Sequence, residues 1–224
     1  MYATKTPKEL FDLAFRLKGR KGSGLLVSGG ADRRGLVPLS PFIPVLKEIK
    51  ERLRLKVAVH IGLVNEEIAQ GLGEVNIDAA MLDIIGSNKT IKRVCHLNAT
   101  VENYEESLRL LANNKVKISP HVVIGLDYGR IEGEKKALEI ISQFEISSLV
   151  LVILNPLLNT PMENVKAPSP EKVREVFLFA RQTFPQIPIL LGCARPAGKY
   201  RMQVDKFAID AGLNGIAYPS EGMV

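Results

Sequence analysis

The stretch GLLVSGGADRRG, residues 24–35, predicts how the fold begins. Residues 25–27 are apolar without alternation, and the run stops at Ser28, Gly29 and Gly30. Such a short apolar run is typical of a strand that is covered on both faces, as in a parallel sheet under helices. A glycine pair after a strand lets the backbone turn sharply or come close to a ligand. The residues by themselves leave both interpretations open.

Similar runs recur along the chain and alternate with amphipathic helices. Strands are expected within residues 24–27, 56–64, 77–85, 117–126, 147–156, 188–196 and 214–220. Helices are expected to follow capping residues at Thr6, Ser40, Asn65, Thr100 and Ser169, and to occupy residues 132–144 and a segment from about 199. Strands that alternate with helices indicate an α/β fold with a parallel sheet.

The count of seven strands, preceded by a helix, favours a partial TIM barrel whose first strand is missing, over an open doubly wound sheet. No linker or repeat divides the sequence, so residues 1–224 are expected to form one domain.

Composition narrows the functional class. The 224 residues are 46% hydrophobic and 24% charged with a net charge of +6, as in a globular protein with a full core. The basic residues form no long tract and Trp is absent, which argues against a nucleic-acid partner. Two cysteines favour a reducing cytoplasm over a disulfide framework. The sequence lacks an apolar run long enough for a membrane span, so a cytoplasmic protein without a membrane partner is expected.

Polar residues lie where the predicted strands end, which is where parallel α/β folds bind ligands. Besides residues 28–30, they are His60, Asp83, His121, Gly125, Asn155, Cys193 and Arg195. Each also has a structural interpretation, as a core hydrogen bond, a strand terminator or a packed thiol.

Asp83 is the strongest single candidate, because a carboxylate inside an apolar run has to be paired. Arg195 similarly needs an anionic partner or solvent. The spacing of His60, Asp83 and His121 matches no zinc signature, so no metal site is predicted.

Several motifs together resemble the radical S-adenosylmethionine proteins of the biotin-synthase and archaeal lipoyl-synthase-like type. They are GLLVSGGADRRGLVPL, VAVHIGLV, LDIIGS, HLNATVENYEESL, ISPHVVIGLDYG and LGCARPAGKYR with IAYPSEG, and they cover essentially the whole chain in order. The resemblance implies a full or partial TIM barrel that binds S-adenosylmethionine. It also implies C–H functionalisation, such as sulfur insertion, on a small-molecule or acyl substrate.

The same resemblance assigns roles to the strand-end residues. Ser28, Gly29 and Gly30 would contact the methionine amino group of S-adenosylmethionine, through backbone carbonyls that accept from the ammonium. It implies that the nucleoside and substrate cavity is lined by His60, Asp83, His121 and Gly125, and that Asn155 and Arg195 lie nearer the substrate.

One departure from the family is serious. The family holds a [4Fe–4S] cluster on a CxxxCxxC loop, whereas Cys95 and Cys193 stand 98 positions apart and cannot replace three clustered ligands. Three explanations remain open: a chain that is short at its N-terminus, a cluster-bearing partner protein, or a degenerate relative that binds a ligand without radical chemistry. An open barrel edge would favour the first two explanations, or self-association at that edge. A TIM-barrel enzyme for a phosphorylated metabolite is a further alternative.

Overall fold

The computed structural model describes residues 3–222. The chain divides into two compact units, which are described separately. The first unit holds Met1–Leu82 with Glu106–Ile118, and the second holds Asp83–Glu105 with Ser119–Val224. The prediction of one domain over residues 1–224 stays a prediction.

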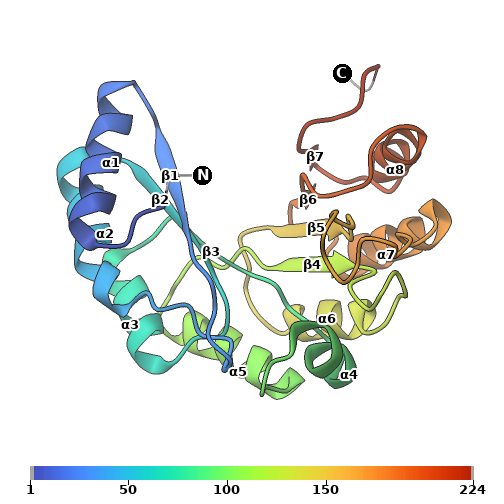
Figure 1. The fold of residues 1–224 in the computed structure, drawn as a ribbon, viewed down its shortest axis with the longest axis horizontal. Helices are drawn as coiled ribbons and strands as arrows, with labels where there is room; N and C mark the ends of the chain where they lie inside the picture. The colour runs from blue at the N-terminus through green and yellow to red at the C-terminus, as the bar shows by residue number, and fades with distance from the viewer. Residues whose placement is uncertain (1–2, 223–224) are drawn as a thin grey trace. The chain divides into compact units, whose positions relative to one another are not determined.

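The first unit is built on the parallel sheet β1-β2-β3. Its elements are α1 (Pro7–Gly19), β1 (Gly24–Ser28), η1 (Ser40–Phe42), α2 (Ile43–Glu48), η2 (Ile49–Leu53), β2 (Lys56–Ile61), α3 (Glu66–Val75) and β3 (Ala79–Leu82). In Figure 1, α1, α2 and α3 lie along one side of these strands. The buried side chains of β2 alternate with partly exposed ones, so the sheet has one covered face and one that is more open.

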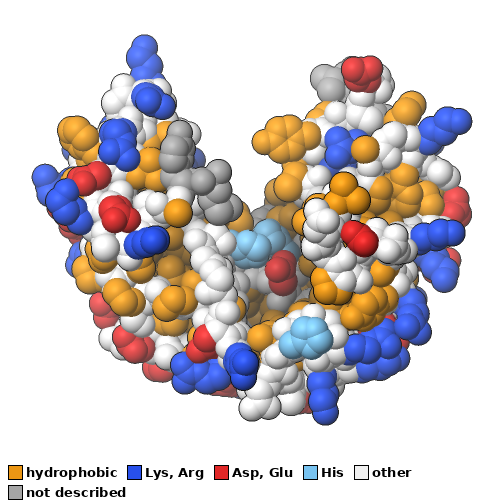
Figure 2. Space-filling view, in the orientation of Figure 1, with side chains coloured by type: hydrophobic (Ala, Val, Ile, Leu, Met, Phe, Trp, Pro, Cys, Tyr) orange, Lys and Arg blue, Asp and Glu red, His pale blue; other side chains and the backbone are white. Residues whose placement is uncertain are grey.

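The second unit is built on the parallel sheet β4-β5-β6-β7. Its elements are α4 (Asn88–Thr90), η3 (Ile91–Cys95), β4 (His121–Ile124), α6 (Glu134–Ile141), β5 (Leu149–Ile153), α7 (Pro170–Thr183), β6 (Ile189–Leu191), α8 (Lys199–Asp210) and β7 (Gly215–Ile216). Helix α5 (Val101–Asn113) begins in the second unit and ends in the first. Figure 2 shows the charged side chains mainly over the helices of each unit.

The predicted fold class is confirmed. Each predicted strand range contains or overlaps a parallel strand, and helices separate the strands. Within residues 3–222 the strands do not close into a barrel, as expected of a partial TIM barrel. No helix among the described residues is long and apolar enough to cross a membrane.

The helix caps show where local sequence signals are reliable. Thr6, Asn65 and Ser169 each accept a hydrogen bond from a first-turn amide, as predicted. The prediction for Ser40 is wrong, because Ser40 is itself the first residue of the 3₁₀ turn η1, and Phe42 stands at the N-cap position of α2 without a side-chain cap bond. Helix α5 begins at Val101, directly after Thr100 as predicted, and the Thr100 amide also donates to Oδ1 of Asn103.

One expectation about β1 is also wrong. The run was expected to be covered on both faces, but the Leu26 side chain is 55% exposed. The reason is that Leu26 lies on the more open face of its sheet, in register with the partly exposed Ala58, while Val57 and Val59 of β2 are buried on the other face. An apolar run therefore does not show whether both faces of a strand are covered.

Candidate functional site

In the first unit, the strand register brings two predicted residues into one row. Ser28 at the end of β1 pairs with His60 of β2, and His60 pairs with Met81 of β3. Registered neighbours in a parallel sheet present their side chains on the same face. Val59 and Ile61 beside His60 are buried on the opposite face, so Ser28 and His60 share the more open one.

The loop that follows β1 exposes bare backbone. A side chain added at Gly30 would meet no heavy atom within 4 Å. Gly30 also lines a cavity of about 390 Å³ in the first unit. Asp32 fixes the loop, because its Oδ1 accepts from the amides of Arg34 at 2.8 Å and Leu36 at 3.1 Å. The Leu36 amide and the Arg34 side chain hold the pKa of Asp32 below its usual range.

Asp32 was not singled out from the sequence. The signal that was available is an Asp in a glycine-rich loop, where its side chain commonly bonds to the backbone two residues later. The ligation of Gly29 and Gly30 to a cofactor stays a prediction, but the open backbone at Gly30 is the feature that such a contact requires.

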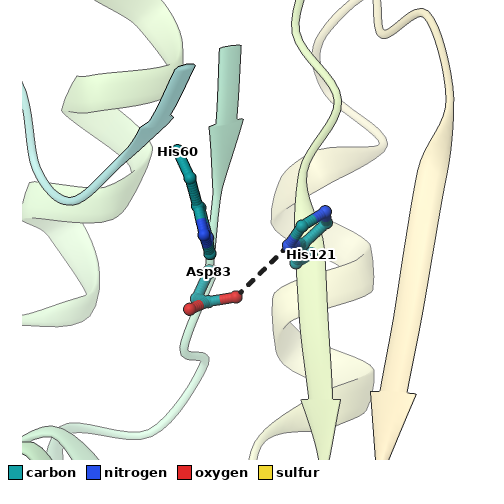
Figure 3. Close-up of side chains that lie close together, drawn as sticks. All are labelled: His60, Asp83 and His121. Atoms are coloured by element: carbon teal, nitrogen blue, oxygen red, sulfur yellow. Dashed lines mark ion pairs between the residues drawn. The ribbon is translucent and has the colours of Figure 1, made fainter. Parts of the chain in front are cut away.

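In the second unit, Asp83 and His121 form a pair (Figure 3). Asp83 directly follows β3 and bridges to His121, the first residue of β4. Oδ1 of Asp83 lies 3.6 Å from Nδ1 of His121. The pairing of Asp83 with another side chain is as expected, but its burial is not: the Asp83 side chain is 45% exposed, against 14% for His121.

The partial exposure of Asp83 has a physical cause. The residue continues the alternation of β3 on the partly exposed face, two positions after Met81, while Leu82 and Ile84 on either side of it are buried on the other face. A carboxylate beside an imidazole is an arrangement that can orient the ring and move a proton. The pair is therefore chemically competent as an acid–base or polar binding group.

Two further groups lie within electrostatic reach of Asp83. Burial, and then the charge of Asp83, raise the pKa of the Cys95 thiol. Burial, with the charges of Cys95 and Asp83, raises the pKa of Tyr104 well above its usual range. Tyr104 was missed because it shares its helical face with Leu108 and Leu111, a spacing that indicates core packing.

Gly125 is held in the second unit by a residue that the sequence did not suggest. It lies just after β4 at φ +81°, and its amide donates to Oε1 of Glu134 at 2.7 Å. A Cβ at Gly125 would lie 2.2 Å from the ring of Pro168, so only glycine fits there. Burial raises the pKa of Glu134, and the Gly125 amide opposes that rise. The cofactor-lining role of Gly125 stays a prediction beside this structural one.

Arg195 has its anionic partner inside the protein. Its Nε donates to Oδ1 of Asp205 at 2.7 Å, and both side chains are fully buried. The guanidinium also donates to the carbonyls of Gly192 at 2.7 Å and Tyr218 at 3.0 Å. These bonds join the loop after β6 to α8 and the segment after β7. Asn155 is exposed after β5. The substrate-binding roles of Arg195 and Asn155 stay predictions.

The thiols do not fit an iron–sulfur cluster. Cys95 is partly buried and Cys193 is exposed, and both are free thiols. A cluster in this family needs three cysteine ligands, and the sequence has two cysteines in all. The open backbone at Gly30, in contrast, fits the methionine end of S-adenosylmethionine, whose ammonium donates to carbonyl oxygens.

Comparison with known proteins identifies relatives. No family model matches the chain. It is 23% identical over 192 residues to the biotin synthase of Clostridioides difficile (strain 630), a match that covers 84% of this chain and 56% of the relative. Further matched curated proteins are also named biotin synthase. The chain spans about half the length of the curated relatives it matches.

Two solved structures share the fold. Methylornithine synthase (PylB) aligns with a TM-score of 0.67 at 16% identity, covering 96% of this chain and 62% of that one. HydG, a maturase of the [FeFe]-hydrogenase, aligns with a TM-score of 0.68 at 18% identity, and the alignment covers 96% of this chain and 50% of the HydG chain. At these identities the two structures establish the fold alone. The curated relatives add a similarity in sequence to proteins named biotin synthase. Together the curated relatives named biotin synthase and these two structures support the relationship that the motifs predict, one to the radical S-adenosylmethionine superfamily.

Proposed function

We propose that this chain is the S-adenosylmethionine-binding part of a radical S-adenosylmethionine-type enzyme, whose cluster is held by cysteines other than Cys95 and Cys193. The observation that carries the proposal is the open backbone at Gly30, directly after the strand whose last residue is in register with His60. The biotin synthase relatives support the reaction class, C–H functionalisation such as sulfur insertion. The substrate would be a small molecule or an acyl group.

Ser28, Gly29 and Gly30 would take the methionine end of the cofactor. The backbone carbonyls accept hydrogen bonds from its ammonium, and the absence of side chains at the two glycines lets the ligand approach. The lining of the nucleoside and substrate cavity remains part of this proposal, by His60, Asp83, His121 and Gly125. So do the substrate contacts of Asn155 and Arg195.

The edge of the first sheet suggests where the cluster-bearing segment binds. β1 is the edge strand of that sheet, so one side of its backbone has no strand partner among residues 3–222. A cavity of about 480 Å³, lined mainly by apolar side chains, lies between α1 and β1, and Leu26 is exposed beside it. An unpaired edge next to an apolar cavity suits an added strand. We propose that a cluster-bearing polypeptide supplies that strand, and self-association at this edge is the competing outcome.

Cofactor binding can be tested without a cluster. Isothermal titration with S-adenosylmethionine would compare the wild type with Gly30→Leu, whose side chain would project into open space without disturbing the fold. Gly19→Leu is a matched control, because a Cβ at Gly19 also meets nothing within 4 Å, at the end of α1. We expect Gly30→Leu to weaken binding at least roughly tenfold, about 1.4 kcal/mol, and Gly19→Leu to leave it unchanged. Equal affinities in all three proteins would refute the cofactor assignment.

The source of the cluster needs a separate measurement. The protein would be isolated anaerobically from its native source, and its intact mass, its iron content and the proteins that copurify would be recorded. Iron together with a cluster-bearing partner, or with a mass above 24.7 kDa, would support the enzyme proposal. A matching mass with bound S-adenosylmethionine but no iron would instead favour a non-catalytic binding subunit. That alternative draws its support from the presence of only two cysteines.

A further inference from the structure

A small cavity in the second unit lies between two of its loops, one after β3 and one after β4. Its volume is about 10 Å³, and Gly86 and Thr90 line it from the segment after β3, while Gly133 and Glu134 line it from the start of α6. The two segments approach closely because both glycines lack side chains: a Cβ at Gly86 would lie 2.2 Å from the carbonyl oxygen of Gly133.

Two buried oxygens at this cavity have unused hydrogen-bonding capacity. Thr90 is 1% exposed and Glu134 is 4% exposed, yet neither Oγ1 of Thr90 nor Oε2 of Glu134 has a hydrogen-bond partner among the described protein atoms. The other carboxylate oxygen, Oε1, is already occupied by the amide of Gly125. Buried polar atoms without a partner are rare, because each costs about 1–3 kcal/mol of desolvation.

The size and chemistry of the cavity indicate which hydrogen-bond partner the two buried oxygens can have. A buried water needs at least roughly 10–15 Å³ of such space and two to four polar neighbours. A metal ion needs more oxygen ligands than the two side chains supply. Most of the other lining residues are aliphatic, among them Ile84, Val122 and Leu126.

We propose that this cavity binds one ordered water molecule that bridges Oγ1 of Thr90 and Oε2 of Glu134. The water links the segment after β3, which begins at Asp83, to the segment after β4, which begins at Gly125. Glu134 thus holds Gly125 directly and Thr90 through the water, so two strand-end loops share one buried polar connection. The proposal is independent of which ligand the protein binds.

The test is a crystal structure of the full chain at a resolution that shows ordered water, for the wild type and for Thr90→Val. We expect one density peak about 2.6–3.2 Å from both oxygens in the wild type, and its loss in Thr90→Val, which keeps the side-chain shape but lacks the hydroxyl. Amide hydrogen exchange in solution should be up to about tenfold faster at Gly125 in the variant. Thr183→Val, in which the lost hydroxyl donates to a carbonyl within α7, should leave Gly125 exchange unchanged.

Three outcomes would overturn the proposal. They are an empty cavity in the wild type, a peak surrounded by five or more oxygens at metal-ligand distances, and a peak that persists unchanged in Thr90→Val. If Thr90→Val does not fold, the wild-type density together with Thr90→Ser, which keeps the hydroxyl and should keep the water, decides the question.

Discussion

The buried ion pair between Arg195 and Asp205 offers the sharpest test of the packing in the second unit. We expect Asp205→Asn to destabilise the protein strongly, because the guanidinium of Arg195 would stay buried without its counter-charge. Oδ2 of Asp205 also accepts a hydrogen bond from the Ser220 amide at 2.8 Å. In Asp205→Asn, an NH₂ group at that position would be a second donor opposite this amide, and the hydrogen bond would be lost.

The magnitude follows from the complete burial of both side chains. Removing one partner of a buried pair costs about 3–5 kcal/mol. For a chain of this size, roughly 2–4 °C of melting temperature correspond to each kcal/mol, so a loss of about 6–20 °C is expected. Asp210→Asn is the matched control on the same helix, because Asp210 pairs with Lys206 at the surface. The Lys206 side chain is 64% exposed and the Asp210 side chain is 43% exposed. Exposed helical pairs contribute only about 0.3–0.5 kcal/mol.

Urea denaturation at pH 7 would measure both variants, with the midpoint compared at constant m-value. A loss below about 1 kcal/mol for Asp205→Asn, similar to that of Asp210→Asn, would refute the reasoning. Replacing both partners, Arg195→Met with Asp205→Leu, leaves no buried charge. That double variant should therefore lose less stability than Asp205→Asn alone.

Three further predictions follow from burial and backbone geometry. Because burial raises the pKa of Glu134 above its usual value of 4.5, the folded state holds a proton that the unfolded state releases, so the contribution of Glu134 to stability falls as the pH rises from about 4.5. The Glu134→Gln variant has no titrating group at this position. Urea titrations between pH 4 and 7 should therefore show that its free energy of unfolding increases relative to that of the wild type as the pH rises. Iodoacetamide should label exposed Cys193 at least about tenfold faster than Cys95, whose pKa is raised by burial, as followed by peptide mass spectrometry. Gly212→Ala should cost roughly 1–3 kcal/mol for its positive φ alone, and Gly125→Ala should cost more because its Cβ meets a proline ring, as measured by thermal unfolding.

Each of these predictions has a result that contradicts it. A constant stability difference across the pH range would show that the pKa of Glu134 does not differ between the folded and unfolded states. Equal labelling rates would show that the Cys95 thiol is more accessible than its burial indicates. Equal losses at the two glycines would mean that the contact with Pro168 relaxes without cost.

The sequence alone determined the parallel α/β architecture and most helix starts, because those signals are local. Apolar runs mark the seven strands, and the caps at Thr6, Asn65 and Ser169 depend on amides three residues away. It also placed polar residues at the strand ends, since the carboxyl ends of parallel strands meet at one edge of a sheet.

The tertiary structure alone decided which partners those residues take. Arg195 needed an anion, but only the return of α8 over the sheet makes that anion Asp205. Glu134 looked like an ordinary first-turn residue until the glycines at 86 and 133 brought two loops together around it. The apolar run around Leu26 likewise could not predict that this side chain is exposed on the more open face of its sheet. These outcomes depend on strand order and loop approach between residues distant in sequence, which periodicity and capping do not encode.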